Sequence, residues 1–384
     1  MRQLLVVLVT ALYLLALPAQ GQETATKSAA EVLAQDLREE VLRFEATVKD
    51  MSGRQETKPV PVTIYRPPGD GPFPLFVLNH GRAVEAKRAQ QGRYRPEPLA
   101  RYLVAKGFVV MVPNRIGYWE TYGGFDPEYS GCRSIEPMSM AASEQVLATV
   151  SFARTLPYVD ASRWLVGGIS VGGLTSVATV GRAPEGLVGG INFSGGTGGN
   201  PDNHPGKPCN PYATTQYWGS IAKNAKVPMV WLYWENDKYW GASIPKDWHK
   251  AWLDGGAGAR FASFEAVGED GHAGINLDMD RWLPVVDQFL HSLGFDAPAI
   301  VQTPPASGFA EIADAGVVPV GNAGRAAYAK FLEMAMPRAF AASGKGSFGF
   351  ARGDYAAGRA LGNCQRYGNP CKLYAVGEDV VWKP

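Results

Sequence analysis

Short apolar runs alternate along the chain with longer segments in which apolar residues recur at helical spacing. Continuous apolar runs at 75–78 and 108–112 are typical of buried parallel strands. Half-buried strands with alternating polarity are predicted at 42–48 and 60–65, further strands at 164–166, 188–193, 229–233 and 262–267, and helices at 98–105, 138–156, 173–180 and 279–293. This alternation predicts an α/β fold with a doubly wound, mostly parallel sheet, whose sites lie beyond the carboxyl ends of its strands.

A stretch rich in proline and small residues divides the chain at 297–308 (APAIVQTPPASG), and its weak periodicity is typical of a linker. We therefore expect an α/β domain over residues 22–296 and a small C-terminal α+β module over residues 309–384. Within the module, the pattern predicts helices at 324–336 and 355–361, hairpin-like stretches around 344–353, and a strand at 373–376. The module's sequence contains no catalytic constellation.

Residues 1–21 have the features of a secretory signal peptide. Arg2 is the only charged residue, an apolar core follows at 4–17, and small residues near 19–21 suit cleavage. A membrane anchor is the alternative, but the apolar run is shorter than the roughly 20 residues that span a bilayer. We expect an exported protein, secreted or periplasmic, with no stable membrane span.

The charge balance gives no sign of a nucleic-acid partner. The formal net charge is +1, and removal of Arg2 with the signal peptide would take it from +1 to 0. Basic residues between 82 and 101 are interleaved with acidic residues and alanines, which is typical of a solvated loop. We therefore expect no nucleic-acid binding.

The four cysteines are Cys132, Cys209, Cys364 and Cys371. An even count in an exported chain favours disulfides over free thiols, and the sequence predicts no metal site. Cys364 and Cys371 are seven residues apart with glycine and proline between them, so we expect them to form a local loop staple. That pairing would leave Cys132 to pair with Cys209.

The segment 168–172 (GISVG) lies between a predicted strand and a predicted helix, which is the context of a serine nucleophile elbow. Gly168 and Gly172 would flank Ser170, because a side chain at either position would strike the strand or the helix as the backbone doubles back. The chain contains 45 glycines, so the pattern alone is weak and an ordinary tight turn is the alternative. Partner residues must decide between them.

A serine hydroxyl needs a base to accept its proton. Of the five histidines, His272 lies in a glycine-flanked loop (EDGHAG, 269–274) after the last predicted strand and before the closing helix. His249 and His291 fall within helical patterns that favour packing or surface positions. His204 lies in a Pro/Gly/Asn loop and is kept as a second candidate. A solvent-exposed loop histidine is the alternative interpretation of His272.

The acid that orients the base should follow the second strand after the elbow. Asp237 lies just past the strand 229–233, and the order Ser170, Asp237, His272 is the one expected for a triad on this kind of sheet. A capping or turn aspartate is the alternative. Glu235 is the fallback acid, since Asp270 is too close to His272 in sequence to orient it easily.

A further polar segment, Asn79-His80-Gly81-Arg82, follows the buried strand 75–78. The loop at this position supplies one backbone N–H to a developing oxyanion, and the residue after the nucleophile supplies another. We therefore assign the two donors to the N–H groups of Arg82 and Val171. His80 is interpreted as a residue that shapes the loop through hydrogen bonds of its ring.

These motifs, with the sequence WLYWEN before Asp237 and Gly271 before His272, make the segment from about 60 to 293 resemble the dienelactone hydrolase family of α/β-hydrolases. The resemblance implies the α/β-hydrolase fold. The enzymes that give the family its name have a cysteine at the elbow, where this chain has Ser170, so the resemblance points to the family's serine esterases. Residues 328–381 are similar to a small C-terminal module of bacterial exported proteins. This similarity implies a Gram-negative periplasmic setting and does not indicate an activity for the module.

The predicted reaction is attack by Ser170 on an ester carbonyl, proton transfer through His272 held by Asp237, and hydrolysis of an acyl-enzyme. No cofactor is needed, and the expected partner is a small-molecule ester. A triad does not specify the leaving group or the acceptor, so a peptidase or an acyltransferase is an alternative. A non-catalytic envelope binding protein on the same fold is another.

Two long loops, 115–137 and 194–217, each contain one cysteine and are predicted to be lids over the serine. A bridge between Cys132 and Cys209 would restrict their opening. An acyl or aryl pocket, or alternatively packing, is expected from the aromatic side chains Tyr118, Trp119, Trp218, Trp234, Tyr239 and Trp240.

Overall fold

The computed structural model describes residues 33–384, apart from 84, 130, 131, 133, 298–302, 354, 367 and 368. The predicted signal peptide therefore lies outside the described residues, as does the centre of the predicted linker. No helix in the described part of the chain has the length and apolarity that crossing a bilayer requires.

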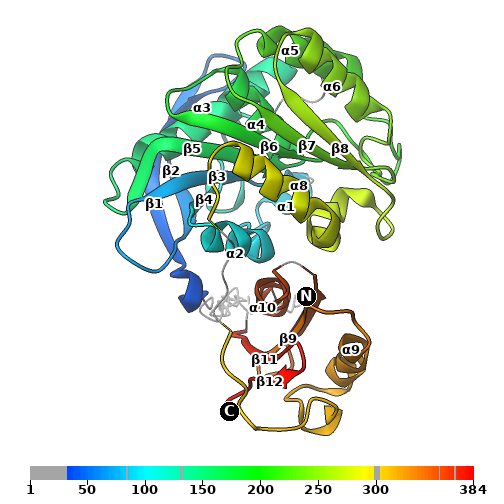
Figure 1. Ribbon diagram of the computed structural model, residues 1–384. Helices are drawn as coiled ribbons and strands as arrows, with labels where there is room; N and C mark the ends of the chain where they lie inside the picture. Colours follow the sequence, from blue (N-terminus) through cyan, green and yellow to red (C-terminus); the bar gives the residue numbers. More distant parts are fainter. Residues whose placement is uncertain are drawn as a thin grey trace, which may run out of the picture. The chain divides into compact units, whose positions relative to one another are not determined.

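Eight strands of the described residues form one sheet in the order β1-β2-β4-β3-β5-β6-β7-β8 (Figure 1). Their bounds are Glu40–Lys49 (β1), Gln55–Tyr65 (β2), Phe73–Asn79 (β3), Val109–Pro113 (β4), Val159–Ile169 (β5), Leu187–Phe193 (β6), Met229–Trp234 (β7) and Ala259–Phe264 (β8). Strand β2 pairs antiparallel with β1 and β4, and all other neighbours are parallel. The predicted mostly parallel sheet is confirmed.

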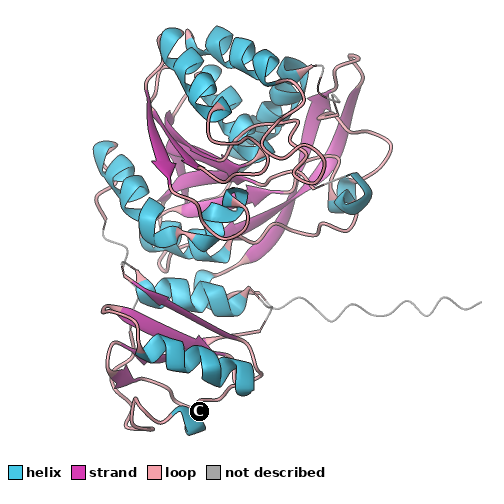
Figure 2. Cartoon of the chain, turned by 90° about the vertical axis from the view of Figure 1, so that its right-hand side faces the viewer, coloured by secondary structure: helices cyan, strands magenta, loops and turns pink. Residues whose placement is uncertain are grey.

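Helices cover both faces of this sheet (Figure 2). They are α1 (Glu85–Arg88), α2 (Glu97–Ala105), α3 (Ile135–Ala153), α4 (Val171–Gly181), α5 (Pro211–Ala222), α6 (Ile244–Asp254), α7 (Gly274–Leu277) and α8 (Met279–Ser292). Because successive strand residues point to opposite faces, Leu75 and Val77 pack in the core with α3 to α6, whereas Phe76 and Leu78 pack with α2 and α8. Both faces are buried, which explains the continuous apolar runs.

The structure differs from the predicted elements where polar side chains redirect the backbone. Helix α5 begins at Pro211 inside the predicted loop 194–217, because the Asn210 side chain accepts the Ala213 N–H at 3.2 Å and caps it. Strand β8 ends at Phe264, three residues before the predicted end at 267. There the Val267 N–H donates to the Asn236 side chain at 3.0 Å instead of a neighbouring strand.

The C-terminal module is a four-stranded antiparallel sheet, β10-β9-β11-β12, with one helix on each face. Its elements are α9 (Asn322–Leu332), β9 (Arg338–Ala342), β10 (Phe348–Arg352), α10 (Ala356–Gln365), β11 (Lys372–Val376) and β12 (Asp379–Val380). A Cys364–Cys371 disulfide ties the end of α10 to the start of β11. The Tyr355 hydroxyl of the module donates to the Arg101 carbonyl at 2.7 Å.

Candidate active site

Ser170 lies at the turn between strand β5 and helix α4. Its backbone has φ 57° and ψ −126°, a conformation that residues with side chains rarely adopt and that is typical of strained functional turns. The Ser170 N–H donates to the Phe193 carbonyl at 3.0 Å, and the Ser170 carbonyl accepts from the Gly196 N–H at 3.1 Å. Strand β6 and the loop after it therefore hold the turn, while the serine stays partly exposed.

Two glycines allow the backbone to double back at this turn. A β-carbon at Gly168 would lie 2.3 Å from the Gly172 carbonyl oxygen, and one at Gly172 would lie 2.1 Å from the Asn79 carbonyl oxygen. Both distances are far below van der Waals contact, and both obstacles are backbone atoms. Glycine is therefore required at each position.

The residues predicted to be the base and the acid are in direct contact. Nδ1 of His272 lies 2.9 Å from Oδ2 of Asp237, whose side chain is fully buried. The other carboxylate oxygen of Asp237 accepts the N–H groups of Tyr239 and Trp240, at 2.7 and 3.2 Å. With a carboxylate as its partner, neutral His272 carries its proton on Nδ1, so Nε2 is free to accept one.

Asp270 holds the histidine loop on the acid loop. One of its carboxylate oxygens accepts both the His272 N–H and the Lys238 N–H, each at 2.9 Å. The Gly271 N–H donates to the Asn236 carbonyl at 3.1 Å. Asp270 thus binds the backbone of His272, whereas Asp237 binds its ring.

Aromatic rings fix the plane of the imidazole. Tyr239 stacks on His272 with ring centroids 4.0 Å apart, and Trp240 lies edge-on at 5.6 Å. The Trp240 indole N–H donates to the Ser194 carbonyl at 2.7 Å, which joins the loop after β6 to the histidine. The ring is therefore held on its edge and on its face before any substrate arrives.

The serine and the histidine come from turns at the same edge of the sheet. Strands β5 to β8 are parallel neighbours and His272 follows β8, so the turns after these strands meet at their carboxyl ends. Gly196, which binds the Ser170 carbonyl, packs against Trp240, and Trp240 packs against His272. In the described part of the chain the His272 ring binds Asp237 and makes no hydrogen bond to the Ser170 hydroxyl. A hydrogen bond between a nucleophile and its base often forms fully only when the substrate is bound.

The loop after β3 reaches the serine from the other side. A β-carbon at Gly81 would lie 3.3 Å from the Ser170 β-carbon. His80 is buried, and its ring binds at both nitrogens: Nδ1 donates to the Gly81 carbonyl at 2.6 Å, and Nε2 accepts the Arg115 N–H at 3.1 Å. Burial, reinforced by the positive charge of Arg115, holds the pKa of His80 well below its usual value, so the ring is neutral.

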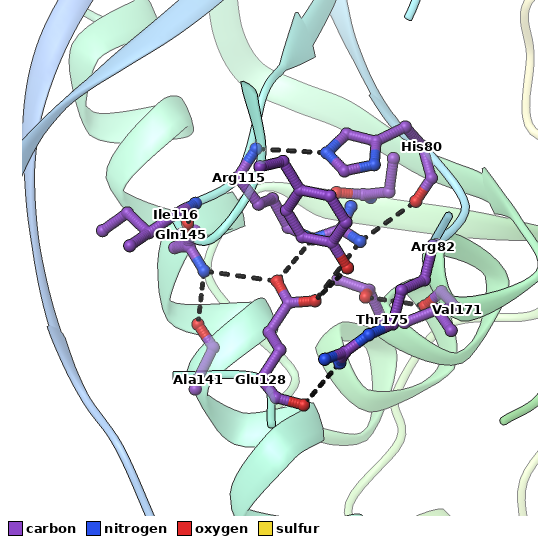
Figure 3. Close-up of polar contacts among 12 residues, drawn as sticks. His80, Arg82, Arg115, Ile116, Glu128, Ala141, Gln145, Val171 and Thr175 are labelled. Carbon is purple, nitrogen blue, oxygen red and sulfur yellow. Dashed lines mark hydrogen bonds and ion pairs between the residues drawn. The ribbon is translucent and has the colours of Figure 1, made fainter. Parts of the chain in front are cut away.

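A buried ion pair beneath this loop was not predicted from the sequence. Arg115 Nε donates to Glu128 Oε1 at 2.6 Å, and neither side chain has any exposed surface. Figure 3 shows Arg115 between His80 and Glu128, with Gln145 on the other side of the carboxylate. The available signal was Arg115 itself, a charge two residues after the end of a buried strand; nothing in the sequence marks Glu128.

The alternative site residues lie apart from this arrangement. Glu235, the fallback acid, is exposed, and so is His204. His249 lies 2.9 Å from the Ala259 carbonyl through Nε2 and packs among core aromatics. His291 is exposed at the end of α8. Of the five histidines, His272 alone has a carboxylate on its ring at the edge where Ser170 lies.

The two predicted lid loops are joined by a Cys132–Cys209 disulfide, and the Asn210 side chain donates to the Cys132 carbonyl at 3.2 Å. Four of the aromatic residues expected near a pocket are at most 1% exposed: Tyr118, Trp218, Trp234 and Trp240. Their rings fill the core, so packing, the alternative interpretation, holds for them. Trp119 and Tyr239 are half-buried.

Among the residues that the structure describes, no group of three or more histidine, cysteine, aspartate or glutamate side chains is arranged to hold a metal ion. A hydroxyl on a strained turn and an imidazole whose Nδ1 faces a buried carboxylate are groups that acyl transfer by a serine requires.

No protein-family model and no curated protein matches the chain. Similar solved structures include a putative dienelactone hydrolase from Klebsiella pneumoniae, with 16% identity, a TM-score of 0.45, and coverage of 66% of this chain and 99% of that one. An acylaminoacyl peptidase from Pyrococcus horikoshii has 15% identity, a TM-score of 0.45, and coverage of 65% and 41%. A predicted CIB-like hydrolase from Thermoplasma acidophilum has 13% identity, a TM-score of 0.41, and coverage of 66% and 100%.

The chain thus spans nearly the whole of the two hydrolases and about two fifths of the peptidase. At these identities the likeness concerns the fold. The chain's own structure has a mostly parallel sheet and a tight turn from the central strand β5 into α4. This topology is that of the α/β-hydrolase fold, as the sequence predicted.

Proposed function

We propose that this protein is a serine hydrolase that cleaves carboxylic esters through Ser170, His272 and Asp237. One observation carries the proposal: the buried Asp237 carboxylate lies 2.9 Å from Nδ1 of His272, at the sheet edge where the strained turn presents Ser170. A carboxylate there selects the tautomer that a general base needs. An exposed loop histidine would have no such partner.

In the proposed reaction, Nε2 of His272 takes the proton of the Ser170 hydroxyl as its oxygen attacks the ester carbonyl. The negative charge that develops on the carbonyl oxygen is bound by the N–H groups of Arg82 and Val171. His272 then gives the proton to the leaving alcohol, and an acyl-enzyme forms on Ser170. A water molecule, activated by the same imidazole, hydrolyses the acyl-enzyme and restores the serine.

We also propose that the protein works outside the cytoplasm. The structure contains the disulfides Cys132–Cys209 and Cys364–Cys371, and disulfides persist mainly in oxidising compartments. Together with the predicted signal peptide at 1–21, this supports a periplasmic or secreted enzyme. The C-terminal module, residues 309–384, is then proposed as an accessory of the exported enzyme with no chemistry of its own.

The test uses Ser170→Ala and a panel of p-nitrophenyl acyl esters of increasing chain length. We expect wild-type protein to hydrolyse at least one ester and to be labelled by a fluorophosphonate probe at Ser170. The variant should lose both properties with its thermal midpoint nearly unchanged. Ester turnover that survives in Ser170→Ala would refute the assignment. Matched p-nitroanilides distinguish a peptidase, and product analysis with added alcohol detects an acyltransferase.

A further inference from the structure

Arg115 and Glu128 form an ion pair with no exposed surface on either side chain. Arg115 follows strand β4, and Glu128 lies in the loop that precedes α3. Removal of two charges from water carries a desolvation penalty that can exceed their attraction, so such a pair is weak support for stability alone. The role of the pair is therefore sought in the groups that it contacts.

Every oxygen of the Glu128 carboxylate is directed at donors. Oε1 accepts from Arg115 Nε at 2.6 Å and from Gln145 Nε2 at 3.4 Å. Oε2 accepts from the Tyr118 hydroxyl at 3.1 Å and lies 3.5 Å from Arg115 Nη2. The backbone carbonyl of Glu128 accepts from Arg82 Nη1 at 2.6 Å. Figure 3 shows how these contacts converge from several elements on one carboxylate.

Arg115 in turn holds His80 at two points. Its Nη2 donates to the His80 carbonyl at 3.0 Å, and its backbone N–H donates to His80 Nε2 at 3.1 Å. This second bond leaves the ring proton on Nδ1, which donates to the Gly81 carbonyl at 2.6 Å. Arg115 thus fixes both the backbone and the tautomer of His80.

The hydrogen bond from the His80 ring to the Gly81 carbonyl sets the direction of the peptide group between Gly81 and Arg82. The carbonyl of Gly81 and the N–H of Arg82 belong to the same peptide, and in a trans peptide they point in opposite directions. With the carbonyl bound to the His80 ring, the Arg82 N–H must point away from that ring. Gly81 itself lies against Ser170, since a β-carbon there would be 3.3 Å from the serine β-carbon.

We propose that the Arg115–Glu128 pair is a positioning unit of the catalytic site, which acts through His80 to orient the Arg82 N–H for the oxyanion. The inference rests on the proposed function, because it takes Arg82 as an oxyanion donor. Arg115 and Glu128 are positioning residues, and neither touches the substrate.

The test variant is Glu128→Gln, which has the same size and no charge. A glutamine carries no charge and places an NH2 group where one carboxylate oxygen stood. Either a donor then faces Arg115 or the Tyr118 hydroxyl must accept instead of donate, and the ion pair is lost. Loss of one oxyanion donor lowers kcat by roughly 10²–10³-fold, and a misaligned donor should lower it by roughly tenfold to a hundredfold. KM should change by less than about threefold, because the donor acts in the transition state.

A second readout separates this role from a structural one. Turnover of a p-nitrophenyl ester is compared with that of its thionoester, whose sulfur is larger and a poorer hydrogen-bond acceptor than oxygen and so gains less from the oxyanion donors. In Glu128→Gln the preference for the oxygen ester should fall. A loss of thermal stability alone would not change this ratio.

The matched control is Glu39→Gln. The Glu39 side chain is also fully buried. Among the described residues its carboxylate pairs with Arg93, at 3.0 Å, and with Arg95, and it accepts the Ala34 N–H, so these partners lie outside the proposed site. It should lose stability and keep the ester-to-thionoester ratio. Tyr118→Phe, which removes only the hydroxyl bond to Glu128, provides a variant expected to fold even if Glu128→Gln does not. It should shift the ratio in the same direction by a smaller factor.

The outcomes separate the two proposals. Wild-type hydrolysis that does not depend on Ser170 overturns the proposed function and this inference with it. Hydrolysis that depends on Ser170, with kcat and the ester-to-thionoester ratio unchanged in Glu128→Gln or, if that variant does not fold, in Tyr118→Phe, overturns the inference alone. A ratio that falls equally in Glu39→Gln also overturns it.

Discussion

Asp237→Asn should trap His272 in the wrong tautomer. In the wild-type protein one oxygen of Asp237 accepts the N–H groups of Tyr239 and Trp240, at 2.7 and 3.2 Å, and the other lies 2.9 Å from His272 Nδ1. The oxygen of an asparagine must keep the first position, because two donors point at it. Its NH2 group then faces Nδ1, which must become an acceptor, so the ring proton moves to Nε2. The imidazole can no longer take the serine proton.

The expected loss is large because a general base in the wrong tautomer is nearly inactive. The corresponding change in a serine protease triad lowers kcat about 10⁴-fold, or roughly 5.4 kcal/mol at about 1.36 kcal/mol per tenfold. We expect a similar fall for Asp237→Asn, with little change in KM, measured with a p-nitrophenyl ester near neutral pH. The thermal midpoint should change little, since the amide has the size of the carboxylate and keeps a hydrogen bond to the ring.

Asp270→Asn is the matched control. The Asp270 oxygen that binds the His272 and Lys238 N–H groups, each at 2.9 Å, is replaced by an amide oxygen with the same capacity. Its turnover should stay close to that of the wild type. The reasoning is refuted if Asp237→Asn retains turnover within about tenfold of the wild type, or if Asp270→Asn loses as much.

Gly172→Ala should lower the free energy of unfolding in urea by roughly 3 kcal/mol or more, because its β-carbon would lie 2.1 Å from the Asn79 carbonyl oxygen. Gly258→Ala, with nothing within 4 Å of its β-carbon, should stay within about 0.5 kcal/mol; equal effects would contradict the close approach. Replacement of Cys132 and Cys209 by serine opens a loop with a sequence separation of 77 and should cost about 4 kcal/mol, seen as a lower calorimetric midpoint; an unchanged midpoint would count against a stabilising bridge. His80 has a pKa well below 6.5 in the folded protein, so below that pH the unfolded chain binds more protons and stability falls as pH falls. His80→Gln should flatten this fall by up to about 1.4 kcal/mol per pH unit in urea titrations at about pH 7.5 and about pH 5; an unchanged slope would show that the ring takes up its proton over the same pH range in the folded and unfolded chains.

Buried strands and amphipathic helices could be predicted because their side chains repeat with the period of the backbone. The runs at 75–78 and 108–112 are continuous because β3 and β4 are covered on both faces. Element ends were predicted less well, because single side chains decide them. Asn210 starts α5 and Asn236 ends β8 through hydrogen bonds that leave no periodic signal.

The candidate triad could be proposed from the sequence because each member follows a strand, and parallel strands bring their carboxyl ends to one edge. The structure places Asp237 and His272 in contact and Ser170 on a strained turn at that edge. The Arg115–Glu128 pair could not be predicted in this way. A charged residue in a loop is ordinarily solvated. Arg115 and Glu128 are buried because they pair with each other, and the spacing of the sequence does not indicate that pairing.

The register between β3 and β5 links the two halves of the proposed site. Asn79, the last residue of β3, pairs with Gly168 in β5, and its side chain donates to the Gly167 carbonyl at 3.1 Å. Its carbonyl oxygen is the atom that excludes a side chain at Gly172. Since Arg82 is three residues further along the same segment, a slip of one residue between these strands would move its N–H by about 3.3 Å along the strand direction. In the proposed site, the glycines of the turn would therefore serve the Arg82 N–H as well as the serine, because they let β3 approach the turn closely.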